Sequence, residues 1–198
     1  KVHQGALQQI DALGQDEYLK MGQFFCHQNF NKQLNTSVIM TYSDALYYFG
    51  KWYLQLWAES LGKDNKGITA IHSVGTTDQH SQLQLYLDGP KDKIFTFITT
   101  QHSKLGFNLN KKTMVDHKID YLINKTMGDL MQAEQEATIE TFKSKNLLFR
   151  EIFFEKIDEI SIGKLMAFSI METVATCLYY NVDPFNQPAV EYGKLLTK

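Results

Sequence analysis

Three groups of polar residues in this sequence have types and spacing suited to acid–base chemistry. The first lies in residues 43–61, whose apolar residues recur at helical spacing and form one stripe. Gln55 and Glu59 are four residues apart, so they share the opposite face of that helix. A carboxylate beside an amide can act as a general base, and it can equally be part of an ordinary solvated helix face.

The second group is the turn Gly75-Thr-Thr-Asp-Gln-His80, which we expect between a strand and a helix. Glycine permits a tight backbone approach, and Thr76 with Gln79 matches the capping-box pattern of a helix start. His80 would lie in the first turn, where the helix dipole favours a neutral imidazole that can transfer protons. The turn could also bind an anion or a hydroxyl-rich ligand, or be a capping box whose histidine merely packs.

The third group is close to the C-terminus. Pro188 is expected to begin a short helix that ends at residue 196. Gln187 and Lys194 are seven residues apart, which is two helical turns along one face. Lys194 is either a proton donor to a ligand oxygen or a surface lysine that complements the C-terminal end of the helix dipole.

The elements that would position these groups alternate between strands and helices. Strands are expected at residues 36–42, 67–74, 94–99 and 147–154, and helices at 5–29 with a break near Gly14, 43–61, 76–88, 121–143, 162–180 and 188–196. Single strands separated by helices favour an α/β fold: a three-layer sandwich with a mostly parallel sheet flanked by helices, plus a C-terminal helical extension. In such sheets ligands bind beyond the carboxyl ends of the strands, where the turn 75–80 would lie.

Composition excludes several classes of partner and cofactor. The chain has 198 residues and a net charge of −2, so there is no basic surplus for nucleic acid. The longest apolar stretch, residues 165–180, falls short of the ~20 residues that span a bilayer, so we expect no membrane contact. Cys26 and Cys177 lack metal-ligand spacing, are expected to be free thiols and favour a reducing, cytoplasmic compartment. No metal cluster or glycine-rich nucleotide motif is found.

Taken together, the three groups resemble glucose-6-phosphate isomerase. The stretches that carry the resemblance are Gln55-Leu-Trp-Ala-Glu-Ser-Leu-Gly-Lys63, Gly75-Thr-Thr-Asp-Gln-His-Ser-Gln-Leu-Gln-Leu85 with Asp88-Gly-Pro90, and Phe185-Asn-Gln-Pro-Ala-Val-Glu-Tyr-Gly-Lys194. They occur in the family's order, and the resemblance extends from about residue 35 to the C-terminus. It implies the second, C-terminal sugar-isomerase domain of that family.

The resemblance also implies domain limits, residue roles and partners. Residues 1–34 would be a helical lead-in from the preceding part of a longer protein, 35–182 the sugar-isomerase domain and 183–198 the segment with the lysine motif. Glu59 would be the catalytic base, His80 and Lys194 would assist ring opening, and Gln55 and Gln187 would contact a sugar-phosphate substrate. The implied glycolytic and gluconeogenic reaction interconverts glucose 6-phosphate and fructose 6-phosphate through a cis-enediol(ate), with no metal or organic cofactor. It implies a homodimer in which the histidine reaches the neighbouring subunit's site.

Departures from the family pattern limit this interpretation. The phosphate-binding Ser/Thr loop and the Gly-Gly-Arg segment of the family have no counterpart here, and Arg150, the single arginine, is not at a matching position. Ala189 stands where the family commonly has glycine. We therefore expect half of the active site to be missing and the isolated chain to be inactive. A non-catalytic sugar-phosphate-binding regulatory domain of the same fold is the alternative, and a dimerisation domain is a third hypothesis.

Overall fold

The computed structural model describes residues 1–110 and 117–197. The helices are α1 (Val2–Ala12), α2 (Gln15–Lys32), α3 (Tyr47–Leu61), α4 (Thr77–Asp88), α5 (Met127–Ser144), α6 (Glu159–Tyr180) and α7 (Pro188–Leu196), with 3-10 turns η1 (Asp44–Leu46) and η2 (His117–Leu122). The strands are β1 (Thr36–Thr41), β2 (Thr69–Val74), β3 (Lys93–Thr100) and β4 (Phe149–Phe154). Every predicted strand is present, and the break near Gly14 separates α1 from α2.

The four strands form one parallel sheet in the order β2-β1-β3-β4. In the register of the sheet, Ile39 of β1 lies between His72 of β2 and Thr96 of β3. A helix separates each strand from the next, as parallel strands require. The predicted α/β fold with a parallel sheet is confirmed.

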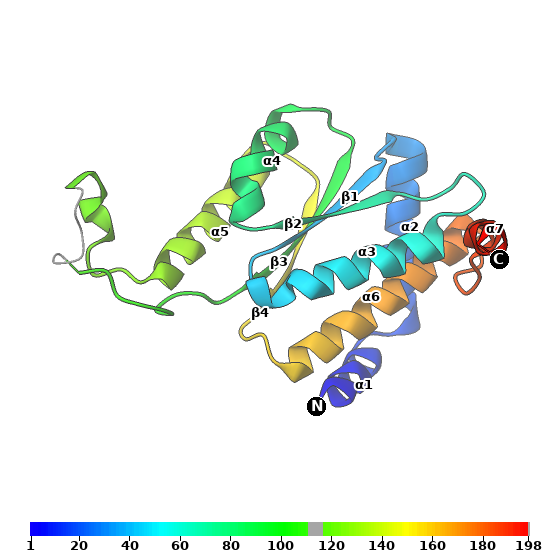
Figure 1. The fold of residues 1–198 in the computed structure, drawn as a ribbon, viewed down its shortest axis with the longest axis horizontal. Coiled ribbons are helices and arrows are strands. Elements are labelled where there is room, and N and C mark those ends of the chain that lie inside the picture. Colours follow the sequence, from blue (N-terminus) through cyan, green and yellow to red (C-terminus); the bar gives the residue numbers. More distant parts are fainter. Residues whose placement is uncertain (111–116, 198) are drawn as a thin grey trace.

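Side chains alternate between the two faces of the sheet and so divide the core into two clusters. Ile39 packs with Phe25 and Trp57 in the cluster formed with α2, α3 and α6. Val38 and Met40 point to the other face and pack in the cluster formed with α4 and α5. Figure 1 shows α4 and α5 on one side of the sheet and α3 and α6 on the other. The three predicted layers are therefore present.

Helices α1 and α2 pack against α6, and glycines allow the close approach. A Cβ atom built on Gly22 of α2 would lie 2.5 Å from the carbonyl carbon of Ala175 in α6. A Cβ atom on Gly163 of α6 would lie 2.0 Å from the carbonyl oxygen of Val2 in α1. The predicted domain limits at residues 34 and 182 stay predictions.

Helix α6 is longer than the sequence analysis expected. Its 22 residues are long and apolar enough to cross a membrane by length and composition alone, so the argument that this stretch is too short was wrong. The helix is nevertheless the central core helix, packed by α1, α2 and α3. Its Glu172 is buried and binds the guanidinium of Arg150 through Nη1 and Nη2. Cys177 and Cys26 are free thiols buried in the same core, as predicted.

Two local predictions were wrong for identifiable reasons. Thr76 and Gln79 form no capping box; the backbone N–H of Val74 instead donates to Asp78 at 2.7 Å, and Tyr42 Oη donates to Gln79 Oε1 at 2.9 Å. The helix expected from residue 121 begins at Met127. The preceding Thr126 forms a capping box with Asp129, and this signal was overlooked.

Candidate active site

Glu59 lies in the last turn of α3 because the other face of this helix is buried. Tyr53 and Trp57 are buried against the sheet, and the indole N–H of Trp57 donates to the carbonyl of Ile68 at 2.8 Å. That bond fixes the end of α3 against the segment that leads into β2. Gln55 and Glu59 consequently face outwards, as their spacing predicted.

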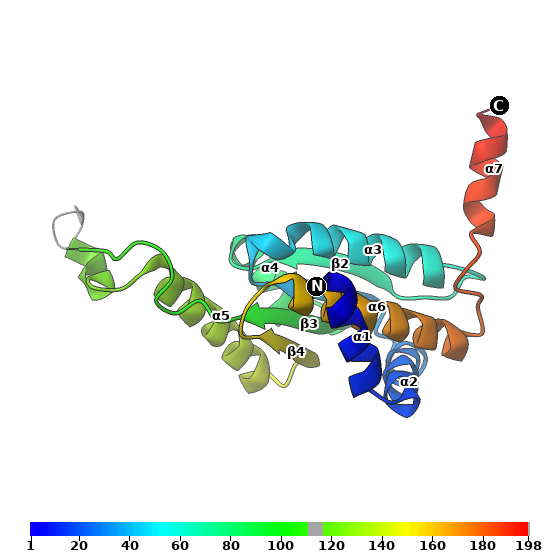
Figure 2. The same cartoon turned by 90° about the horizontal axis from the view of Figure 1, so that it is seen from below.

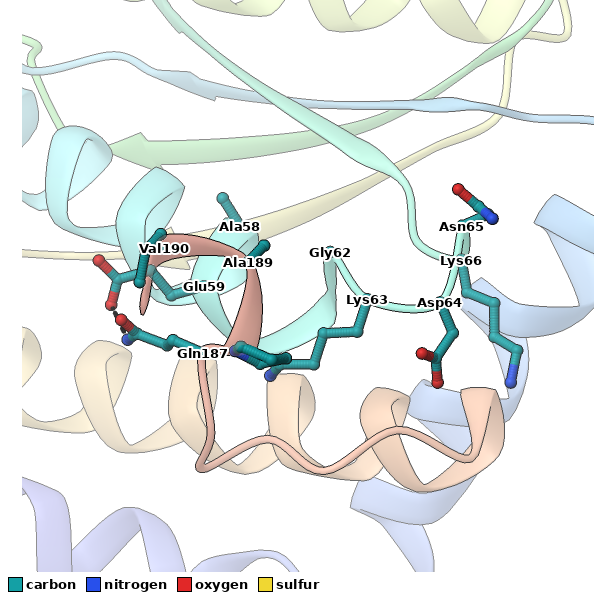
Figure 3. Close-up of a pocket in the computed structure, with 11 residues that line it drawn as sticks. Ala58, Glu59, Gly62, Lys63, Asp64, Asn65, Lys66, Gln187, Ala189 and Val190 are labelled. Atoms are coloured by element: carbon teal, nitrogen blue, oxygen red, sulfur yellow. Dashed lines mark hydrogen bonds between the residues drawn. The ribbon is translucent and has the colours of Figure 1, made fainter. Parts of the chain in front are cut away.

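Two glutamine amides hold the carboxylate of Glu59. Gln55 Nε2 donates to Oε1 at 3.0 Å from one turn earlier in α3. Gln187 Nε2 donates to Oε2 at 2.8 Å from the segment before α7, 128 residues away in sequence. Figure 3 shows Gln187 reaching Glu59 from that segment. Three of the five predicted site residues are thus in direct contact.

A cavity of about 550 Å³ opens beside this carboxylate. It lies between the end of α3, the loop that follows it and the start of α7 (Figure 3). Its lining consists of Ala58, Glu59, Gly62, Lys63, Asp64, Asn65, Lys66, Gln187, Pro188, Ala189 and Val190. The volume is in the range of about 300–1,000 Å³ that is typical of small-molecule sites.

Two lysines that were not among the predicted site residues hold the C-terminal segment at the cavity. Lys63 Nζ donates to the carbonyl oxygens of Ser60 and Asp183, each at 2.7 Å. Lys66 Nζ donates to the carbonyl of Tyr180 at 3.0 Å, at the C-terminal end of α6. These bonds join the loop after α3 to the segment that carries Gln187. Lysines in a polar loop gave no sequence signal that would separate them from solvated ones.

Lys194 does not reach the cavity in this chain. Its Nζ pairs with Glu191 at 2.7 Å, and both side chains are about 63% exposed. Figure 2 shows α7 standing away from the body of the molecule with the C-terminus at its far end. No residue of α7 is buried in the described part of the chain. The motif that carries Lys194 is therefore near Glu59 only at its first residues, Gln187 to Val190.

His80 lies at the opposite edge of the sheet from Glu59. Helix α3 runs from the carboxyl edge to the amino edge, so Glu59 lies near the start of β2. His80 is exposed in the first turn of α4, just after the end of β2. A six-residue strand spans about 20 Å. The turn itself is tight as predicted, because a Cβ atom on Gly75 would lie 2.6 Å from the Tyr42 ring.

A metal centre has no support in the described residues. Across residues 1–110 and 117–197, no group of three or more His, Cys, Asp or Glu side chains is arranged to hold a metal ion.

Comparison with known proteins identifies relatives of this fold and site. The chain is 41% identical to the probable glucose-6-phosphate isomerase of Methanococcus maripaludis over 83% of its length and 36% of that protein. It is 37% identical to the glucose-6-phosphate isomerase of Rubrobacter xylanophilus, over 82% of the chain and 38% of that protein. The Campylobacter jejuni enzyme of the same name is 36% identical over 92% of the chain and 45% of that protein. No protein-family model matches the chain.

Solved structures agree with the sequence comparison. A hypothetical protein from Thermus thermophilus superposes with a TM-score of 0.86 at 30% identity, covering 98% of this chain and 48% of that one. A glucose-6-phosphate isomerase from Chlamydia trachomatis superposes with a TM-score of 0.68 at 19% identity. The match covers 91% of this chain and 37% of that one, and it supports the fold alone.

The parallel sheet and its helical layers make this chain a three-layer α/β domain of the fold found in these solved structures. Its named relatives are glucose-6-phosphate isomerases, so the chain is homologous to a part of these proteins and the resemblance predicted from the three motifs is confirmed. The chain spans 36% to 45% of the length of these curated relatives.

Proposed function

We propose that this chain is the C-terminal part of an aldose–ketose isomerase that interconverts glucose 6-phosphate and fructose 6-phosphate. The observation that carries the proposal is the Glu59 carboxylate, held by two glutamine amides beside a cavity of about 550 Å³. Relatives that carry the name of this enzyme support it.

In this proposal Glu59 is the general base. Its carboxylate removes the proton from C2 of the open-chain aldose, and the electron pair left at C2 forms the cis-enediol(ate) as the C1 carbonyl becomes an oxyanion or hydroxyl. A proton passes from O2 to O1, and the carboxyl group returns its proton to C1. One carboxylate can serve both steps because C1 and C2 are bonded to each other, and the proton leaves C2 and returns to C1 on the same face of the planar enediol(ate). Gln55 and Gln187 donate to the carboxylate and so fix its orientation, and in this proposal they also contact the substrate.

Ring opening precedes isomerisation and requires proton transfer between the ring oxygen and the anomeric hydroxyl. We assign this step to His80 and Lys194, an imidazole and an ammonium of suitable chemistry. His80 lies across the sheet from the Glu59 cavity of its own chain. The assignment therefore requires His80 from a second copy, and we propose a homodimer in which each subunit supplies the histidine of its neighbour's site.

Recognition of the phosphate is proposed to lie outside these 198 residues. Arg150 is engaged elsewhere, since its Nη2 donates to Glu172 at 2.8 Å and its Nε to Thr96 Oγ1 at 3.0 Å. Gln55, Glu59 and Gln187 are all exposed in this chain, so water reaches the base. We propose that the remainder of the protein covers the cavity, that the isolated chain has little or no turnover, and that the full protein works in the cytoplasm, in glycolysis and gluconeogenesis, without a cofactor.

The test is conversion of glucose 6-phosphate to fructose 6-phosphate by the full-length product of the gene, with the 198-residue chain assayed beside it. Turnover by the full-length protein and none by the folded shorter chain are expected. A folded full-length protein without turnover would overturn the enzyme proposal and favour the sugar-phosphate-binding regulator. Robust turnover by the shorter chain would refute the argument that part of the site lies elsewhere.

A further inference from the structure

A second cavity of about 480 Å³ lies at the amino-terminal edge of the sheet, beside β3 and β4. Its lining comes from the end of α2, the loop between α4 and β3, and the loop between α5 and β4, and it shares no residue with the Glu59 cavity. The lining residues are Gln28, Lys32, Leu34, Tyr86, Pro90, Lys91, Lys93, Phe95, Lys145, Asn146, Leu147 and Leu148. We call it the lysine pocket because four of these residues are lysines.

The four lysines are only partly neutralised. Lys93 pairs with Asp92, and Lys91 Nζ donates to the carbonyl of Leu87. Within the described part of the chain, the ammonium groups of Lys32 and Lys145 have no hydrogen-bond or ion-pair partner. Two of the four charges thus remain available to a ligand.

An ordinary structural role accounts for part of this charge. Helices α2, α4 and α5 all end at this edge of the sheet, and lysines near helix C-termini complement the negative end of the helix dipole. Each helix end carries about half a negative charge, and Asp92 adds one carboxylate. An excess of about 1.5 positive charges remains after these are subtracted from the four ammonium groups. This excess gathers in one concavity of a chain whose net charge is −2.

The apolar wall that the pocket exposes comes from Pro90, Leu147 and Leu148. Behind it lie the buried side chains of Leu34, Tyr86 and Phe95, the two rings packed edge to face at 5.1 Å between centroids. The cavity is much larger than one phosphate group and falls within the usual range for small organic ligands. A ligand that fits this lining combines an anionic part for the lysines with an apolar part for this wall.

We propose that the lysine pocket binds a small molecule of the nucleoside phosphate class, with its phosphates on the lysines and its ring against the apolar wall. Lysine binds phosphate as a flexible point charge, so the site needs no glycine-rich loop of the kind that the sequence lacks. The inference concerns a site separate from Glu59 and does not rest on the proposed isomerase activity.

The test is ATP binding to the full-length protein, measured by calorimetric titration in the presence of excess fructose 6-phosphate, so that the proposed sugar-phosphate site is filled. The variant Lys32→Gln/Lys145→Gln removes from the pocket the two charges that have no partner in the described part of the chain. The matched control Lys51→Gln/Lys156→Gln removes two exposed charges from other surfaces. We expect ATP binding to weaken at least tenfold in the pocket variant and to stay within twofold in the control, with isomerase turnover equal in all three proteins.

Tripolyphosphate is the second probe, because it carries the charge of ATP without the ring. It should bind more weakly than ATP to the unchanged protein. No ATP binding at millimolar concentration, equal weakening in both variants, or an unaffected pocket variant would each overturn the proposed site. Tripolyphosphate that binds as tightly as ATP would overturn the ligand class.

Discussion

Lys63 joins the two parts of the chain that meet at the candidate site. It is half-buried, and its ammonium group donates to one carbonyl at the end of α3 and to another in the segment leading to α7. Glu59 lies on the first of these parts and Gln187 on the second. We therefore propose that Lys63 is a positioning residue, which acts on the carboxylate through the backbone that carries its partner Gln187.

Replacing Lys63 with Met should lower kcat of the full-length enzyme at least tenfold with a smaller effect on KM. Each hydrogen bond from a charged donor contributes about 1.5–3 kcal/mol, and about 1.4 kcal/mol corresponds to a tenfold change in rate. Lys51→Met, on the exposed face of the same helix, is the control and should leave kcat unchanged. Lys63→Arg should restore part of the rate. A Lys63→Met enzyme that folds and turns over like the unchanged protein would contradict this role.

His72 gives the fold a pH dependence near neutrality. It is half-buried on β2, and a ring nitrogen, Nε2, lies 3.0 Å from Thr41 Oγ1. Burial lowers the pKa of this imidazole below its usual value of 6.5, and Lys51 lowers it further. The folded protein thus binds this proton less readily than the unfolded chain does.

The stability that His72 contributes should be present above pH 6.5 and should be lost as pH falls through the lowered pKa. Urea unfolding at pH 8, 6.5 and 5.5 measures this slope, and His72→Gln should flatten it. The pKa values of the Asp92 and Asp158 carboxyl groups are lowered from 3.8. The stability that these two groups contribute is therefore lost only as the pH falls below 3.8, outside the pH range of this measurement. If the unfolding free energy of His72→Gln depends on pH as steeply as that of the unchanged protein, the pH dependence comes from another group.

At the scale of elements, helix α6 is the one against which the N-terminal helices α1 and α2 pack. Gly22 and Gly163 let α2 and α1 approach its backbone more closely than any side chain permits. The helix begins at Glu159 because Asp158 accepts from the N–H groups of Ile160 and Ser161, both at 3.0 Å. This cap extends α6 beyond its apolar stretch, which explains why its length was underestimated.

Gly22→Ala should destabilise the protein by about 1–3 kcal/mol, because the added methyl group overpacks the contact with Ala175. Gly193→Ala is the matched control: nothing lies within 4 Å of its Cβ position, and the same substitution there should raise local helix stability by about 0.5–1 kcal/mol. Denaturant midpoints of both variants give the comparison. A neutral Gly22→Ala variant would show that α2 can shift away from α6 without cost.

The elements could be predicted where local sequence determines them. The β-branched run from Thr36 predicts β1, and Pro188 marks the first residue of α7. The capping box predicted at Thr76 is absent, and the side-chain oxygen of Gln79 that would complete it instead accepts from Tyr42 Oη. Periodicity placed Gln55 beside Glu59, whereas the contact from Gln187 joins residues 128 apart and follows from the fold alone.

At the scale of the whole molecule, the acid–base residues of the proposed reaction lie at two edges of one sheet. Glu59 is at the amino edge and His80 at the carboxyl edge, separated by about the length of a six-residue strand. Helix α7 extends from the first edge without burial in the described part of the chain. We therefore propose that a complete site for this reaction requires a longer protein and a second copy of it.

Subunit mixing tests the shared site. Glu59→Gln and His80→Asn homodimers should each be inactive, whereas a hybrid dimer has one site with both unchanged residues. Random exchange of equal amounts makes half of the dimers hybrid, so about one quarter of the unchanged activity should return. Activity that stays at the level of the separate variants after exchange would place both residues in the same subunit's site or exclude His80 from the reaction.

The most direct test of the account is the turnover of the full-length Glu59→Gln protein, with circular dichroism to verify its fold. Glutamine preserves the shape of the side chain and removes the base, so kcat should fall by a factor of about 10²–10⁴ while assembly stays intact. Proton exchange between C2 of the substrate and solvent should be lost with it. A folded Glu59→Gln protein that retains turnover within tenfold of the unchanged enzyme would contradict the assignment of Glu59 as the base.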